Sequence, residues 1–361
     1  MKIMTILGTR PEIIRLSRII PILDDLCDHI LVHTGQNYDQ KLSDIFFTDL
    51  TLRSPDYLLD CRSPTLMGQI GEILRACEQV MLKEKPDRLL ILGDTNSALA
   101  AMVAKRLRIP VYHMEAGNRC YDDRVPEEIN RRVIDHCSDI LLPYTERSRA
   151  NLLREGIDGE RIYVTGNPIG EVLSYYTDKI EQSQALQMRG VAANSYFLVT
   201  LHRAENVDDE RRLAKFITAL HKLSGEYKMP LICSLHPRTR SQLEKQSKTL
   251  AGTGIQVVEP LGLFDFAFLE KNAYCVLSDS GTVQEECSLF KIPNVTLRDV
   301  TERPETLESG SNLIAGCEPE AISRAVKTVL SQGWDWEPPP EYLVPNVSRK
   351  VVKILLNGVV G

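Results

Sequence analysis

The sequence predicts an α/β protein built of two Rossmann-like, doubly wound domains. The chain has 361 residues, and at roughly 100–200 residues per domain this length indicates two domains. Short apolar runs alternate with longer helical patterns, which is typical of parallel sheets that carry helices on both faces. The unusual polar clusters nearly all follow an expected strand, and loops leaving the carboxyl ends of such strands build binding sites.

The first half of the chain contains a series of expected strands. An apolar run at 3–7 leads into a Gly-Thr-Arg-Pro turn and a helix that we expect to continue through Leu26. The run at 88–92 ends at Gly93-Asp94 and precedes a helix rich in Ala and Leu. The other expected strands of this half span residues 29–34, 110–113, 140–143 and 162–165.

The same pattern restarts in the second half after a polar, helical stretch. The expected strands there span residues 197–201, 231–235, 256–258, 274–277 and 294–297. We therefore expect an N-terminal domain over 1–168 and a C-terminal domain over 185–335. A Pro-rich connector, GWDWEPPPEYLVP, then leads into a final helix expected within 342–361.

Composition and charge exclude several classes of function. The net charge of -6 argues against a general nucleic-acid binder or a protein of acidic membrane surfaces, because both need a broad basic surface. No apolar stretch reaches the ~20 residues that span a bilayer, and the N-terminus lacks a signal-peptide layout. The nine cysteines form no CxxC pair, which indicates reduced thiols and no zinc site. We expect a cytoplasmic protein without a bound metal.

The first polar cluster, Gly8-Thr9-Arg10-Pro11-Glu12, follows the first expected strand. Glycine allows a tight turn there, and Pro11 suits the first turn of a helix. Arg10 would then reach over the sheet edge, where a guanidinium can bind a diphosphate with two hydrogen bonds. An exposed arginine on a turn is the alternative. Because the chain has no GxGxxG motif, a nicotinamide or flavin is disfavoured and we expect no cofactor.

Acidic residues gather after two strands and at one helix start of the first half. Asp94 follows the strand at 88–92, Glu115 follows the strand at 110–113, and Glu127 begins a helix with Arg131 four residues later. Structural roles are available: Asp94 can cap a helix, and Glu127 can pair with Arg131. The functional interpretation is that the three carboxylates converge at one sheet edge, where raised pKa values suit proton transfer.

Two basic corners follow strands of the second half. They are His202-Arg203 and His236-Pro237-Arg238. A single histidine in such a place is more often structural. Two similar corners facing the acids of the first half indicate groups that bind phosphate or shuttle protons.

The segment SDSGTVQEE suits a nucleotide. Ser280, Gly281 and Thr282 would lie at a helix N-terminus, whose free N–H groups bind phosphate oxygens. Glu286, about one turn further on, can accept hydrogen bonds from a ribose diol. An ordinary Ser/Gly helix cap is the alternative. Arg303 lies in the later polar loop RDVTERPE and is expected to be extended because Pro304 follows it. As a charge run alone this segment would be a solvated loop, and Arg303 is the remaining candidate nucleotide contact.

The motifs resemble a known family when they are taken in order. They are GTRPEII, LGDTNS, MEAGNR…PEEINR, LHRAEN, LHPRTR, SDSGTVQEE and RDVTERPE. Together they resemble the non-hydrolysing UDP-N-acetylglucosamine 2-epimerase family, from residue 2 to about residue 330. The resemblance implies a GT-B-like fold with a cleft between its domains, a last helix packed on the first domain, a UDP-N-acetylhexosamine substrate and a homodimer active in envelope polysaccharide synthesis.

The resemblance also implies roles for residues at matching positions. In the family, a proton leaves carbon 2 as UDP departs, and UDP then adds back to a 2-acetamidoglycal. The matching acid/base carboxylates are Asp94, Glu115 and Glu127, with Arg131 and His202 in support. The matching diphosphate contacts are Arg10, Ser280, Gly281 and Thr282, and the matching ribose contact is Glu286.

The sequence departs from the family pattern at two places. The common Ser-Gly-Gly run is Ser-Gly-Thr here, and the segment after Glu115 is short and reads AGNRCYDDRV. That version looks like the branch that forms UDP-N-acetyl-L-fucosamine from a 6-deoxy-L-talose nucleotide. A GT-B glycosyltransferase, a hydrolysing 2-epimerase and a non-enzymatic sugar-nucleotide sensor are the competing interpretations.

Overall fold

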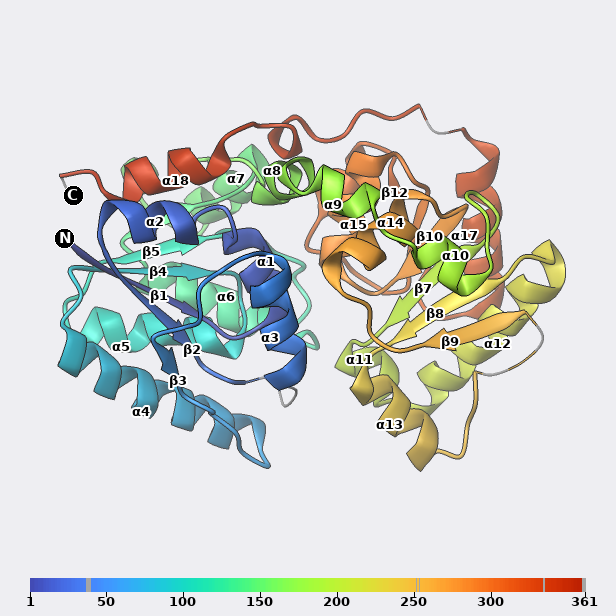
Figure 1. Cartoon of the computed structure of the whole chain (residues 1–361), viewed down its shortest axis with the longest axis horizontal. Helices are drawn as coiled ribbons and strands as arrows, with labels where there is room; N and C mark the ends of the chain where they lie inside the picture. Colours follow the sequence, from blue (N-terminus) through green and yellow to red (C-terminus); the bar gives the residue numbers. More distant parts are fainter. Residues whose placement is uncertain (37–39, 251, 253, 334, 359–361) are drawn as a thin grey trace. The chain divides into compact units, whose positions relative to one another are not determined.

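The chain divides into two units, each built around its own sheet (Figure 1). The computed structural model describes residues 1–36, 40–250, 252, 254–333 and 335–358, and only the backbone at 40–44. Unit 1 comprises Met1–Ser174 with Glu341–Gly361, and unit 2 comprises Tyr175–Pro340.

Unit 1 contains a parallel sheet of six strands in the order β3-β2-β1-β4-β5-β6. This is the Rossmann order, in which the connection reverses direction between β1 and β4. The strands are β1 (Lys2–Leu7), β2 (Asp28–His33), β3 (Tyr57–Leu58), β4 (Arg88–Leu92), β5 (Val111–Met114) and β6 (Ile140–Leu142).

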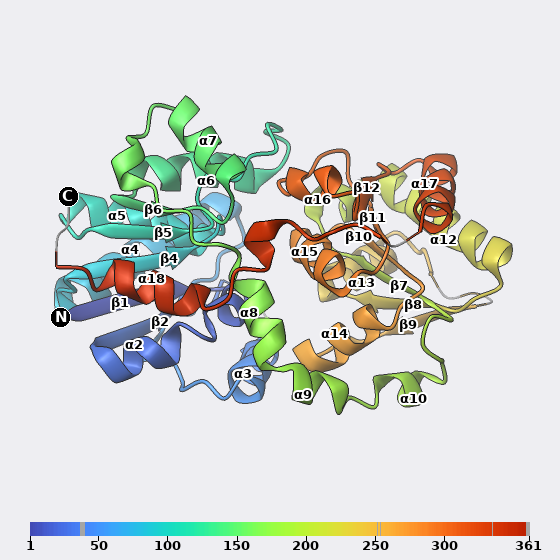
Figure 2. The same cartoon turned by 90° about the horizontal axis from the view of Figure 1, so that it is seen from above.

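Helices cover both faces of the unit 1 sheet. On one face, apolar side chains of β1, β4 and β5 pack against α4 (Leu66–Glu84), α5 (Ala100–Arg106) and α6 (Pro126–Cys137). Over the other face lie α2 (Ile20–Leu26) and α18 (Val347–Leu355), which contact each other (Figures 1 and 2). The end of α18 is tied to the sheet, because the Arg88 guanidinium donates to the carbonyl oxygens of Leu355 and Asn357.

Unit 2 repeats the same strand order. Its parallel sheet runs β12-β11-β10-β7-β8-β9, which reverses direction between β7 and β10. The strands are β7 (Phe197–Leu201), β8 (Leu231–Leu235), β9 (Ile255–Val258), β10 (Cys275–Ser278), β11 (Asn294–Thr296) and β12 (Asn312–Ile314). The predicted fold class, two doubly wound α/β halves, is confirmed.

Two apolar clusters hold the unit 2 sheet between helices. One cluster joins the sheet to α12 (Glu210–Tyr227), α13 (Pro237–Lys245) and α17 (Pro319–Ser331). The other joins it to α10 (Ala185–Arg189), α14 (Leu263–Lys271) and α15 (Gly281–Phe290). The remaining helices are α1 (Arg10–Leu16), α3 (Gln40–Asp49), α7 (Glu146–Arg154), α8 (Pro168–Tyr175), α9 (Thr177–Glu181), α11 (Ala204–Val207) and α16 (Pro304–Glu308), with short 3₁₀ turns at Asn96–Leu99, Gly159–Arg161 and Pro340–Tyr342.

Several elements differ from the sequence prediction. The helix expected through Leu26 is broken into α1 and α2, because Pro21 lacks the N–H that would bond Ser17 and its ring clashes with that carbonyl. The expected strand at 162–165 forms only an isolated bridge between Ile162 and Leu141, since β6 ends before Pro143. The two edge strands β3 and β12 were not predicted, because they are too short to show an alternating pattern.

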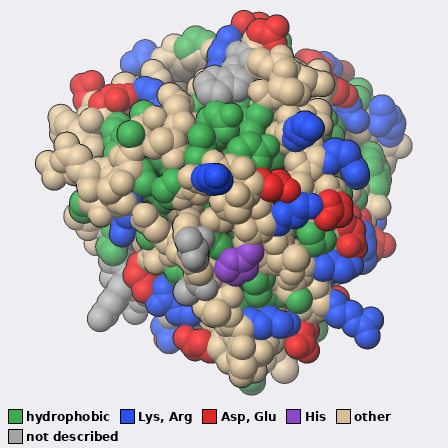
Figure 3. Space-filling view, turned by 90° about the vertical axis from the view of Figure 1, so that its right-hand side faces the viewer, with side chains coloured by type: hydrophobic (Ala, Val, Ile, Leu, Met, Phe, Trp, Pro, Cys, Tyr) green, Lys and Arg blue, Asp and Glu red, His purple; other side chains and the backbone are tan. Residues whose placement is uncertain are grey.

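The surface agrees with the balanced composition. On the face shown in Figure 3, Lys and Arg side chains are interspersed with Asp and Glu side chains. Of the helices in the described part of the chain, none combines the length and hydrophobicity that crossing a membrane requires.

Candidate functional site

The turn between β1 and α1 is closed by a buried glutamate. Glu12 Oε2 accepts hydrogen bonds from the amides of Gly8 and Thr9, each at 2.7 Å. Its Oε1 accepts one from Thr95 Oγ1, also at 2.7 Å, so it links this turn to the one beside Asp94. Burial raises the pKa of Glu12 to about 7 against the effect of these hydrogen bonds. Arg10 begins α1, and its guanidinium lies 5.7 Å from the centre of the Phe46 ring.

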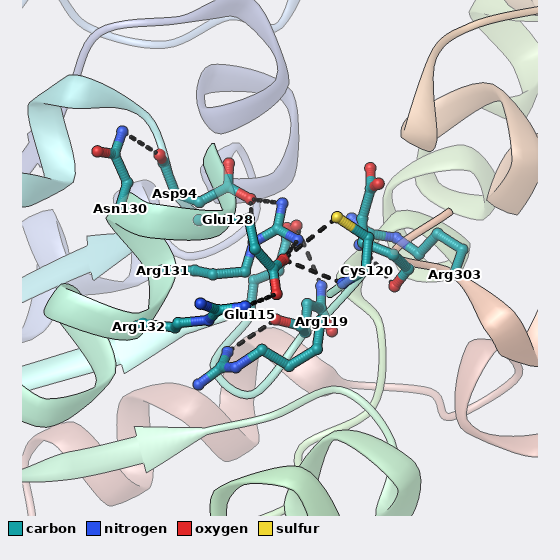
Figure 4. Close-up of polar contacts among 12 residues, drawn as sticks. Asp94, Glu115, Arg119, Cys120, Glu128, Asn130, Arg131, Arg132 and Arg303 are labelled. Carbon is teal, nitrogen blue, oxygen red and sulfur yellow. Dashed lines mark hydrogen bonds and ion pairs between the residues drawn. The ribbon is translucent and has the colours of Figure 1, made fainter. Parts of the chain in front are cut away.

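Asp94 is held by the arginine that the sequence singled out. Arg131 Nε and Nη2 lie 3.1 and 2.6 Å from Asp94 Oδ2 (Figure 4). The Asp94 carbonyl oxygen accepts a hydrogen bond from Asn130 Nδ2 at 2.9 Å, so α6 fixes both the backbone and the side chain of Asp94. The alternative role of Asp94 as a helix cap is wrong, because Thr95 is the N-cap of the following turn.

Glu128 is a site residue that the sequence interpretation missed. Its Oε2 accepts a hydrogen bond from Arg131 Nη1 at 2.7 Å. Its two oxygens also accept hydrogen bonds from the amides of Cys120 and Tyr121, each at 3.0 Å. Burial opposes the charge of Glu128, but the Cys120 amide and Arg131 outweigh it and hold its pKa below the usual range. The spacing of three residues to Arg131 was the available signal. Glu128 therefore fixes both Arg131 and the short AGNRC loop.

Glu115 ends β5 in a left-handed backbone conformation, with φ of 66°. This region is uncommon for a non-glycine residue and often marks a functional position. The buried carboxylate pairs with the Arg15 guanidinium, which also lies 5.7 Å from the centre of the Tyr144 ring. Its Oε1 also accepts a weak hydrogen bond from Asn118 Nδ2 at 3.4 Å. Arg15 was missed because it lies 100 residues away in the sequence.

Three predicted acids thus lie on elements that adjoin one another. Asp94 and Glu115 follow the neighbouring strands β4 and β5, and Glu127 lies in the first turn of α6, which starts at Pro126 as predicted. The contacts described above join Arg131 to Asp94 and Glu128, and the pairing of Arg131 with Glu127 stays a prediction.

In unit 2, His202 is anchored by a buried aspartate. The His202 Nδ1 atom lies 2.9 Å from Asp279 Oδ1, and Asp279 also accepts the amides of His202 and Arg203. Burial opposes the charge of Asp279, but His202 and the two amides outweigh it and lower the Asp279 pKa to about 2. Asp279 therefore orients the His202 ring through its Nδ1 atom.

The second predicted corner lies beside the first. The ring centres of His202 and His236 are 6.1 Å apart. His236 is the N-cap of α13, and its Nδ1 accepts a hydrogen bond from the Arg238 amide at 3.2 Å. The structure therefore brings both histidines together at one edge of the unit 2 sheet.

The N-terminus of α15 begins as the sequence predicted. Ser280 is the N-cap, and Gly281 and Thr282 are the first helical residues. A Cβ atom at Gly281 would lie 2.5 Å from Glu302 Oε1, so only glycine fits this position without a shift. Glu302 is itself balanced by Arg298, whose Nη1 lies 2.7 Å from its Oε2.

Arg303 and Glu286 are both buried. Arg303 has φ of -121° but ψ of 56°, so the fully extended geometry expected before Pro304 is wrong. Its guanidinium pairs with Glu285 inside unit 2, and this packing decides its conformation. Burial and the nearby Glu286 raise the pKa of Glu270 well above its usual value, and Cys287 Sγ lies 3.2 Å from Glu270 Oε1.

These groups suit proton transfer and anion binding. Unit 1 supplies carboxylates held by arginines at adjacent strand ends, and unit 2 supplies a helix N-terminus beside an aspartate-anchored histidine. Within the described residues, no group of three or more His, Cys, Asp or Glu side chains is arranged to hold a metal ion.

Comparisons with known proteins agree on one family. Residues 24–356 match the family model described as UDP-N-acetylglucosamine 2-epimerase. The UDP-N-acetylglucosamine 2-epimerase of Methanocaldococcus jannaschii is 42% identical over 99% of this chain and 100% of its own length. Its crystal structure in complex with UDP-GlcNAc and UDP has a TM-score of 0.94, covering 98% of this chain and 99% of that one. A UDP-2,3-diacetamido-2,3-dideoxy-D-glucuronate 2-epimerase of Pseudomonas aeruginosa is 38% identical over 92% of this chain and 93% of its own.

Proposed function

Because this chain belongs to the UDP-N-acetylglucosamine 2-epimerase family, we propose that it inverts carbon 2 of a UDP-linked N-acetylhexosamine without net hydrolysis. The resemblance inferred from the ordered motifs is thereby confirmed at the level of the family, which is a family of isomerases. The observation that carries the proposal is the placement of Asp94 and Glu115 after adjacent strands, each paired with an arginine.

The proposed chemistry removes UDP and one proton from the sugar and then adds UDP and one proton back. A carboxylate removes the proton from carbon 2 while the bond from carbon 1 to UDP breaks, which leaves a 2-acetamidoglycal and UDP. UDP then adds back at carbon 1 as carbon 2 takes a proton on the opposite face. We assign the proton transfers to Asp94, Glu115 and Glu127. No water is consumed, so the product remains a UDP-sugar.

The arginines keep the proposed acids ready for transfer. Arg131 fixes the Asp94 carboxylate by two hydrogen bonds to one oxygen, and Arg15 fixes Glu115. Carboxylates that are already fixed in this way do not have to change orientation when charge develops in the transition state.

We assign UDP binding to Arg10, His202, His236, Arg303 and the start of α15. The N–H groups at Ser280, Gly281 and Thr282 suit the phosphates, because a helix N-terminus attracts negative charge. His202 supports this assignment, since its Nδ1 is fixed by Asp279 and its partly exposed ring can assist the leaving diphosphate. Glu286 is proposed to bind the ribose diol.

The finer substrate assignment is the 6-deoxy branch. The short AGNRCYDDRV segment supports it, and Glu128 orders that segment through the amides of Cys120 and Tyr121. The P. aeruginosa relative, named for a diacetamido glucuronate, adds a third substrate to be tested. A homodimer and a cytoplasmic location remain predictions, and light scattering would show a dimer as twice the 40.7 kDa mass of one chain.

Proton NMR in deuterated water tests the proposal. The purified protein is offered UDP-N-acetylglucosamine, the UDP-6-deoxy-L-talose derivative and the diacetamido glucuronate nucleotide in turn. Deuterium at carbon 2 of an intact UDP-sugar is the expected result, and the fastest substrate identifies the branch. Free UDP released only when an acceptor sugar is present would instead indicate a glycosyltransferase, and a free sugar product would indicate the hydrolysing reaction.

A further inference from the structure

A buried ionic network lies directly behind the two strand ends that carry Asp94 and Glu115. At its centre is His113 of β5, which is fully buried. His113 Nδ1 lies 2.9 Å from Asp135 Oδ1, and His113 Nε2 lies 2.9 Å from the carbonyl oxygen of Gly93. None of these groups is part of the acid/base chemistry assigned above.

The partners of His113 fix the orientation of its ring. The carbonyl of Gly93 can only accept a hydrogen bond, so Nε2 donates to it. The opposite ring nitrogen, Nδ1, contacts the buried carboxylate of Asp135, which lies on α6. The ring therefore bridges the end of β4 and α6.

Arg119 completes the network and balances its charge. Its Nη1 lies 2.8 Å from Asp135 Oδ2, and its Nε and Nη2 lie 2.8 and 2.5 Å from the Glu155 carboxylate (Figure 4 shows Arg119). Arg119 thus joins Asp135 to Glu155, and this pairing is what allows the charges of Arg119 and Asp135 to remain buried.

The network forms hydrogen bonds with backbone groups next to the proposed acids. The Gly93 carbonyl immediately precedes Asp94, and the Gly117 amide, two residues after Glu115, lies 3.2 Å from Asp135 Oδ2. Gly117 has φ of 80° and Glu115 has φ of 66°, so this turn follows an uncommon path. A path of that kind persists only when surrounding contacts hold it.

We propose that His113, bridging Asp135 and Gly93, is a positioning residue that sets the relative placement of the Asp94 and Glu115 carboxylates. The proposal rests on the proposed function of those carboxylates. A single ring on β5 contacts the carbonyl that follows β4, so displacing it would shift both acids together. A shift of about 1 Å in reacting groups lowers turnover by about 100-fold.

The test compares two variants with a matched control. H113Q places its donor N–H groups on one nitrogen, so it cannot bridge Gly93 and Asp135 as the ring does. D135N keeps hydrogen-bonding groups but removes the negative charge that contacts His113 and Arg119. The control is H29Q, because His29 is also buried on a strand and also paired with an aspartate, with Nδ1 2.5 Å from Asp24 Oδ1.

Three readouts separate positioning from simple support of the fold. We expect H113Q to lower kcat by about 100-fold and D135N by about tenfold, with KM for the UDP-sugar changed by less than about threefold. We expect H29Q to lower the melting temperature about as much as H113Q does but to keep kcat within about twofold.

The outcomes are distinguishable. Equal kcat values in H113Q and H29Q would overturn the positioning role while leaving the proposed function intact. A wild-type protein that exchanges no carbon 2 proton with any of the three nucleotides would overturn the proposed function, and this inference with it.

Discussion

Arg131 donates two hydrogen bonds to a single oxygen of Asp94, at 2.6 and 3.1 Å, and a third to Glu128 at 2.7 Å. The guanidinium is almost fully buried between the two carboxylates. A lysine could not reproduce this arrangement, because its ammonium is a compact charge without the planar fork. The acid at the end of β4 is thus oriented from α6, and this relationship leads to the first prediction.

Replacing Asp94 by asparagine should abolish most of the turnover and leave UDP binding largely intact. The amide keeps the shape of the side chain but cannot accept a proton, and general acid–base groups contribute about 10²–10⁴-fold. Carbon 2 deuterium exchange and calorimetric titration with UDP measure the two effects. The exposed Asp158, replaced in the same way, is the control. Unchanged exchange in D94N would remove Asp94 from the mechanism.

Replacing Asp279 by asparagine should slow turnover by about 10²-fold, because a neutral side chain no longer fixes His202 through its Nδ1 atom. The Asp209→Asn variant alters only an exposed helix cap and should keep its rate. Equal rates in the two variants would refute the role of Asp279.

The Asp279 carboxylate should also make the free energy of unfolding depend on pH in the acidic range. Its pKa is lowered from 3.8 to about 2, so its stabilisation is present above pH 3.8 and is lost as pH falls through about 2. The lost stabilisation is about 2 kcal/mol, on the basis of 1.36 kcal/mol per pKa unit. Acid unfolding followed by circular dichroism should show a steeper loss between these pH values in the wild type than in D279N.

Replacing Gly281 by alanine should weaken UDP binding by about tenfold, which corresponds to about 1.4 kcal/mol. The new methyl group would meet Glu302 Oε1 at 2.5 Å and disturb the first turn of α15. Gly225 of α12 is the control, since nothing lies within 4 Å of a Cβ there. G225A should keep UDP affinity and gain about 0.5–1 kcal/mol of stability. Identical UDP affinities in G281A and the wild type would place the phosphates elsewhere.

Replacing Glu270 by glutamine should make the protein less sensitive to rising pH. Burial and Glu286 raise the Glu270 pKa well above 4.5, so its folded form stays protonated where its unfolded form is ionised. Wild-type stability should therefore fall as pH rises from 4.5 towards that raised pKa, and E270Q should lack this loss. Melting temperatures measured across this range provide the comparison, and parallel curves would contradict the prediction.

The fold was predictable because each central strand is a short apolar run followed by a turn signal. Gly93, for example, ends β4, and Pro126 starts α6. The edge strands β3 and β12 are runs of two and three residues, which carry little periodic signal. The break before α2 had a local signal in Pro21, which the sequence interpretation did not use.

The site was predictable only where residues stand at strand ends within ordered motifs. Asp94, Glu115 and His202 meet that condition. Their partners do not: Arg15 lies 100 residues before Glu115, and Asp279 lies 77 residues after His202. Charge pairing over such separations requires the folded chain, and so does the bridge that His113 forms between Asp135 and Gly93.

The return of the last residues to unit 1 has a consequence for biosynthesis. Arg88 of β4 is bonded to carbonyls at the end of α18, the Asn167 amide to the Glu341 carbonyl, and Glu171 to Ser348. During synthesis, all residues of unit 2 therefore leave the ribosome before the last residues of unit 1 do. The half that is made first is completed last, so a nascent chain stalled before residue 341 would expose an apolar stripe on α2 to chaperones and proteases.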